Sequence, residues 1–102
     1  MDTGFRWAVI FLSGSSALSE EERLKVVGYA GDMYFRSQKE KHISFEGYRG
    51  LVTTKGEWSV LGCFSGQVFN AELWPQDGTE KIKLSFLISE QTYGTGATYS
   101  MN

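Results

Sequence analysis

The residues best suited to covalent chemistry in this chain are its one cysteine and its one histidine, Cys63 and His42. A thiolate–imidazole pair needs the base within about 3 Å of a partly exposed sulfur. Cys63 stands in the middle of an expected strand beside Gly62, and a free cysteine there usually packs as a small apolar side chain. One cysteine and one histidine also fall short of familiar metal-ligand spacing. We expect no catalytic residue, metal or cofactor, and the residues favour a protein that is not an enzyme.

Two further chemistries have weaker support. The loop at 13–16 joins an expected strand to an expected helix, where a phosphate could meet backbone donors, but it lacks the spacing and the lysine of a phosphate-binding loop. Glu20, Glu21 and Glu22 at the helix start would repel an anion. Opposed carboxylates on neighbouring strands come within about 5 Å, yet no spacing rule selects a pair. The carboxylates in turns or on polar strand faces are Glu46, Glu57, Glu72, Asp77 and Glu80.

Basic and aromatic side chains alternate between residues 34 and 55. Within 36–55 there are five basic and two acidic residues, although the whole chain has a net charge of −2. Basic side chains beside stacking aromatics are the components of a platform for single-stranded nucleic acid. The pI near 5.3 is low for such a module. Nucleic-acid binding through 34–55 is therefore the third-ranked prediction.

Two tryptophans follow different patterns. Trp58 shares its strand face with Val60 and Phe64, which predicts a core position. Trp74 shares a face with polar Asn70 and Glu72 just before a turn, and an exposed tryptophan there is a good anchor for a protein interface. The alternative is that Trp74 folds over the sheet edge and is buried.

The elements that must position these residues begin with a strand at 5–12, apolar on both faces and therefore interior to a sheet or at a dimer seam. A helix is expected at 20–37, because Ser19 and Glu22 form a capping-box pattern and three glutamates complement the helix dipole. Gly28 and Gly31 are expected to approach the sheet closely. The predicted buried helix face consists of Leu24, Val27, Gly31, Tyr34 and Phe35.

After residue 42 the hydrophobic period changes from 3.6 to 2. Strands are expected at 42–46, 50–54, 57–65, 68–74 and 81–89. Lys55-Gly56 is read as a hairpin turn, and Gly66-Gln67 as another short connection. Residues 90–102 are predicted to form an edge strand or a flexible tail.

The order β-α-β-β-β-β-β predicts an α+β fold: one amphipathic helix packed on a curved antiparallel sheet of five to six strands. The length of 102 residues fits a single domain, 1–102. This order is similar to that of cystatin-like domains. The likeness is one of layout, because Gln67-Val68-Phe69-Asn70 departs from their Gln-x-Val-x-Gly hairpin and Trp74-Pro75 reverses their Pro-Trp order. It therefore transfers no functional residue.

The leading prediction for function is a non-catalytic binding protein, such as an inhibitor, an adaptor or an immunity-type factor, which acts through a protein–protein surface. The expected contacts are Trp74, Tyr48 and Arg49. The alternative is a small-ligand-binding or catalytic domain with a pocket between helix and sheet. Its predicted lining is Trp58, Phe64, Phe86 and Tyr34.

The lone cysteine favours a reducing compartment, and no apolar run long enough to span a bilayer occurs. We expect a soluble cytoplasmic protein whose partner is another protein and which does not bind membranes. A homodimer is a further expectation, with Tyr93 and Tyr99 at its edge.

Overall fold

The computed structural model of the chain describes residues 8–62, 64–89 and 97–100. It confirms the predicted fold class and element order, one helix on an antiparallel sheet. In chain order the elements are β1 (Ala8–Ser13), the short 3-10 helix η1 (Ser15–Ala17), α1 (Glu20–Phe35), β2 (Glu40–Phe45), β3 (Tyr48–Leu61), β4 (Phe64–Pro75), β5 (Ile82–Ser89) and β6 (Ala97–Ser100). Among the described residues no helix has the length and apolar content that a membrane crossing requires.

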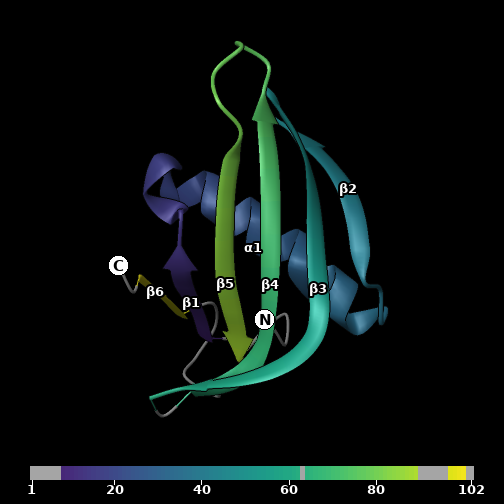
Figure 1. The fold of residues 1–102 in the computed structure, drawn as a ribbon, viewed down its shortest axis with the longest axis vertical. Helices are drawn as coiled ribbons and strands as arrows, with labels where there is room; N and C mark the ends of the chain where they lie inside the picture. Colours follow the sequence, from purple (N-terminus) through teal and green to yellow (C-terminus); the bar gives the residue numbers. More distant parts are fainter. Residues whose placement is uncertain (1–7, 63, 90–96, 101–102) are drawn as a thin grey trace, which may run out of the picture.

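The strands form one sheet in the order β2-β3-β4-β5-β1-β6. The pairs from β2 to β1 are antiparallel, whereas β6 lies parallel to β1. Helix α1 lies across one face of the sheet, behind the strands in Figure 1. We call the opposite face, which is turned to the reader, the open face.

The N-terminus of α1 follows its sequence signals. The Ser19 backbone N–H donates to Glu22 Oε1 at 2.9 Å, and the Glu22 N–H donates to Ser19 Oγ at 3.2 Å. These two bonds satisfy backbone donors that a helix start leaves unpaired. The helix ends at Phe35, two residues before the predicted end, and Ser37 takes a positive φ of 55°.

The prediction for the buried helix face was partly wrong. The buried stripe is centred on Ala30 and consists of Val26, Val27, Ala30, Gly31 and Met33. Leu24 and Phe35 are instead 45% and 68% exposed. The sequence offers apolar residues on more than one side of the helix, so the pattern alone does not fix its rotation. The expected close approach of Gly28 is also wrong, because a Cβ atom there would meet nothing within 4 Å.

The core fills the space between α1 and the helix-facing side of the sheet. Phe86 lies at its centre, with ring centroids 5.6 Å from Phe11 and 6.0 Å from Phe69. In β1, Ile10 is buried on the open side while Phe11 is buried on the helix side. The expectation of an interior strand is thereby confirmed, since β1 also has a neighbour on each edge.

The predicted turn at Lys55-Gly56 is a bulge within β3. The register of β3 and β4 shifts between Thr54 and Trp58, and Gly56 has a φ of 73°. A glycine in this conformation serves a bulge as readily as a turn. The Gly56 N–H donates to Thr54 Oγ1 at 3.1 Å, which holds the bulge in place.

The hairpin of β3 and β4 therefore extends further than the sequence suggested. Pairing of β4 with β5 ends at Gln67, whereas pairing with β3 continues to the pair of Leu61 and Phe64. Figure 1 shows this extension bending sideways below the end of β5. Trp58 is 60% exposed on the extension, so its predicted core position was wrong.

Candidate binding surface

Strand register arranges the side chains of the open face in rows that cross the sheet. The first row is Ser44, Arg49 and Trp74, on β2, β3 and β4. The second row is His42, Leu51, Glu72 and Lys83. The third row is Glu40, Thr53, Asn70, Ser85 and Ser13. The face thus changes from cationic and aromatic at one end to hydroxyl and amide groups in its middle.

Arg49 and Trp74 are direct cross-strand partners. Directly opposed residues on an antiparallel pair have Cβ atoms about 5 Å apart, so both side chains contribute to one surface. Trp74 is 40% exposed and Arg49 is exposed. Two of the three predicted contacts, Arg49 and Trp74, therefore lie side by side on one face. The alternative of a buried Trp74 is wrong.

Tyr48, the third predicted contact, lies on the other side of the sheet. Its ring packs against Phe45 with centroids 5.5 Å apart, beneath the start of α1. Burial, then the negative charges of Glu22 and Asp77, raises the pKa of the Tyr48 phenol. Adjacent residues of a strand point to opposite faces, so Tyr48 and Arg49 cannot share one face.

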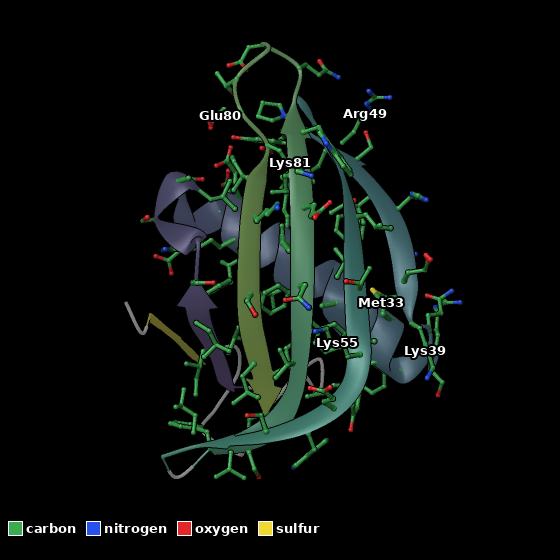
Figure 2. All side chains as sticks on the ribbon, viewed as in Figure 1. Met33, Lys39, Arg49, Lys55, Glu80 and Lys81 are labelled. Carbon is green, nitrogen blue, oxygen red and sulfur yellow. The ribbon has the colours of Figure 1, made fainter. Side chains whose placement is uncertain are left out.

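Lys81 completes the site from the β4–β5 loop. Its Nζ lies 5.6 Å from the centroid of the Trp74 ring and 3.5 Å from Glu72 Oε1. Figure 2 shows Lys81 and Arg49 at the same end of the sheet. We call the group of Ser44, His42, Arg49, Trp74 and Lys81 the Trp74 patch.

The charges of the open face are unevenly compensated. Among the described residues, Lys81 has Glu72 as its ion-pair partner, whereas Arg49 and Lys83 have no carboxylate within ion-pair distance. Lys83 stands across from Glu72 on β5, but that carboxylate bonds to Lys81 instead. The face therefore presents two uncompensated cations beside an exposed indole.

Two shallow hollows mark the open face. One of about 490 Å³ lies within the Trp74 patch and is lined by His42, Ile43, Ser44, Arg49, Gly50 and Trp74. The other, of about 410 Å³, includes Leu51, Thr53, Asn70, Lys83 and Ser85 in its lining. The two hollows share no lining residue, but both border on β3 and β4. We call the open surface over the three rows the track.

The structure assigns structural roles to residues with displaced pKa values. Hydrogen bonds from the Thr79 backbone and hydroxyl, at 3.1 and 2.9 Å, lower the pKa of Asp77 and order the β4–β5 loop. A hydrogen bond to Glu46 raises the pKa of Lys25 and ties α1 to the β2–β3 turn. Neither residue lies in the track on the open face.

Among the residues that the structure describes, the remaining sequence candidates do not converge on one site. The start of α1 bonds to its own capping residues, and no cluster of metal-ligating side chains occurs within the described ranges. Cys63 and Tyr93 lie outside the described residues, and of Tyr99 the structure describes only the backbone in β6. The fold also separates the residues predicted to line a pocket, and the basic and aromatic residues of 34–55.

The residues proposed for a pocket between helix and sheet do not line one cavity. Phe86 is fully buried in the core, and Trp58 is on the exposed hairpin. Tyr34 lines a separate hollow at the C-terminus of α1. The basic and aromatic segment 34–55 is likewise distributed, because Phe45 and Tyr48 face the helix while Arg49 faces the open side.

Searches against protein-family models, curated proteins and solved structures gave no match to this chain. The open face must therefore be interpreted from its own chemistry.

Proposed function

We propose that this protein is a non-catalytic binding module that recognises another protein through the open face of its sheet, with the Trp74 patch as the centre of contact. The observation that carries the proposal is the direct opposition of Arg49 and Trp74 on the face that α1 leaves uncovered. Tryptophan and arginine are the residue types most enriched among energetic hot spots of protein interfaces.

The surroundings of the pair support recognition rather than catalysis. The hollows on this face are open and shallow, whereas small-molecule sites usually enclose most of their ligand. Most side chains along the track are hydroxyls, amides and ions from the adjacent strands β2 to β5. Such groups are rigidly spaced by the sheet, and a partner could be bound without a large ordering cost.

A comparison of two exposed tryptophans tests the proposal. The full chain would be immobilised as wild type, as Trp74→Ala/Arg49→Ala and as Trp58→Ala, and proteins retained from its native lysate would be compared by quantitative mass spectrometry. We expect a partner that wild type and Trp58→Ala retain and the double variant loses. Trp58 is the matched control, because it is an exposed indole outside the patch.

The affinity for that partner gives the quantitative test. Isothermal titration should show that Trp74→Ala/Arg49→Ala weakens binding by at least about 30-fold, or about 2 kcal/mol, as expected for hot-spot residues. A partner lost equally by Trp58→Ala, or retained by the double variant, would assign recognition to another surface.

Location and assembly complete the proposal. The single cysteine supports work in a reducing compartment such as the cytoplasm. A homodimer paired along β6, with Tyr93 and Tyr99 at its edge, stays a prediction, and a monomeric mass by analytical ultracentrifugation would remove it.

A further inference from the structure

The size of the exposed track limits what can bind there. Four strands at about 4.8 Å spacing and three rows of side chains span roughly 15 Å by 14 Å. A standard protein interface buries about 800 Å² on each partner, several times more than this track offers. An extended peptide segment matches the available area better than a second globular surface.

The charges of the track define the chemistry of that segment. Arg49 lies on β3 in the first row, and Lys83 lies on β5 in the second row. Neither has an ion-pair partner among the described residues. Arginine binds carboxylates in a bidentate manner, so two carboxylates on the segment would compensate both cations.

The spacing of these cations fits an extended chain. They are separated by two strand spacings and one row, which corresponds to roughly 12 Å. Positions i and i+4 of an extended peptide lie about 13 Å apart on one face. The residue between them, at i+2, would stand over β4 midway between Trp74 and Glu72, where an apolar side chain can still reach the indole.

From this juxtaposition we propose that the partner presents an extended acidic segment with two carboxylates four positions apart, one bound by Arg49 and the other by Lys83, around an apolar residue on Trp74. The inference rests on the proposed function and specifies its partner. The hydroxyl and amide groups of Thr53, Asn70 and Ser85 would lie beside the rest of the segment.

A peptide suits this surface better than a nucleic acid. Single-stranded nucleic acid carries a phosphate at every nucleotide and prefers a continuous basic groove. Here Glu72 lies between the cations, the third row contains Glu40, and the chain as a whole has a net charge of −2. Localised carboxylates avoid these negative groups, whereas a uniformly charged chain does not.

The probe is a fluorescein-labelled decapeptide of serine, threonine and alanine, with glutamate at its third and seventh positions and leucine at its fifth. Fluorescence anisotropy would compare it with the same peptide carrying glutamine in place of glutamate, and with a ten-nucleotide oligothymidylate. We expect saturable binding of the acidic peptide, weaker binding by about tenfold or more for the glutamine peptide, and weaker binding at high salt.

Charge reversal locates the site. The variant Arg49→Glu/Lys83→Glu should bind the acidic peptide about tenfold or more weakly than the wild type does. It should instead bind a version of the peptide that has lysines at positions three and seven. The matched control is Lys39→Glu/Lys55→Glu, which changes the net charge equally. Its two lysines lie well below Arg49 in Figure 2 and likewise have no ion-pair partner among the described residues.

Three results would overturn the inference. They are equal binding of the glutamate and glutamine peptides, equal loss in the control variant, and tighter binding of oligothymidylate than of the acidic peptide at the same site. No saturable binding up to about 1 mM would also reject it. If the lysate partner is nevertheless lost by Trp74→Ala/Arg49→Ala, the proposed function stands and only the acidic segment is wrong.

Discussion

Gly50 lies on the helix-facing side of β3, where a Cβ atom would stand 2.5 Å from Leu73 Cδ2 and 2.6 Å from the Glu72 carbonyl oxygen. The carbonyl belongs to a paired central strand and cannot move freely. Gly50→Ala should therefore lower the free energy of unfolding by about 1–3 kcal/mol, the usual cost of overpacking. Urea unfolding followed by circular dichroism measures the change.

Gly28 is the control for that substitution. It is exposed in the interior of α1, and a Cβ atom there would meet nothing within 4 Å. Gly28→Ala should raise the free energy of unfolding by about 0.5–1 kcal/mol, because alanine has the higher helix propensity. If both substitutions were to destabilise the protein alike, the close contact around Gly50 would not be the cause.

At the scale of single residues, the candidate site was partly predictable from the sequence. Polar neighbours on its strand face indicated Trp74, and the importance of arginine in protein interfaces favoured Arg49. Period-2 alternation already places Tyr48 and Arg49 on opposite faces, and applying it would have removed Tyr48. Direct opposition of Arg49 and Trp74 needed the register of β3 and β4, which no local pattern specifies.

At the scale of elements, Asp32 connects α1 to the edge strand β2. Its carboxylate accepts a hydrogen bond from Arg36 Nε at 3.1 Å and lies 3.5 Å from Lys41 Nζ. The hydrogen bond from Arg36, and then the positive charges of Arg36 and Lys41, hold the pKa of Asp32 below its ordinary value of 3.8. Ionised Asp32 therefore stabilises the folded chain.

This pKa shift predicts a pH-dependent effect of Asp32→Asn. Because the pKa is lowered on folding, its contribution is complete above about pH 3.8 and is lost as the pH falls through the folded value. The variant should have a slightly lower urea midpoint than wild type at pH 7, and the difference between the two midpoints should disappear towards pH 3. Glu57→Gln is the control, since no ion pair of Glu57 occurs among the described residues. A gap that widens in acid would contradict the prediction.

The elements were predictable where local chemistry decides them. The capping box fixed the helix start, and β5 has the alternating pattern of 81–89 almost unchanged. The bulge at Gly56 was not predictable, because lysine followed by glycine fits a tight turn as well as a bulge. The predicted turn at Lys55-Gly56 also led to the wrong core position for Trp58. The exposed extension that carries Trp58 exists only because β3 continues past the bulge.

For the whole molecule, the helix-facing side of the sheet carries the core, and the proposed function assigns recognition to the first rows of the open face. Core side chains such as Phe69 and Leu73 point to α1 and are fully buried. The three rows of the open face contain charged groups, hydroxyls and Trp74, and these side chains contribute little to the core. Surface residues of this kind can change without large effects on folding, so the proposed binding surface can be altered without unfolding the chain.

Leu73 and Trp74, neighbours on β4, test this division. Leu73 is fully buried on the helix side, so Leu73→Ala should cost about 2–5 kcal/mol of unfolding free energy. Trp74→Ala should cost at most about 1 kcal/mol and yet abolish binding of the acidic decapeptide. Urea unfolding of both variants measures the loss of stability. Fluorescence anisotropy, at a temperature where Leu73→Ala remains folded, measures the loss of peptide binding. If Trp74→Ala destabilises the chain as much as Leu73→Ala does, the indole is part of the core, and loss of binding would report unfolding rather than recognition.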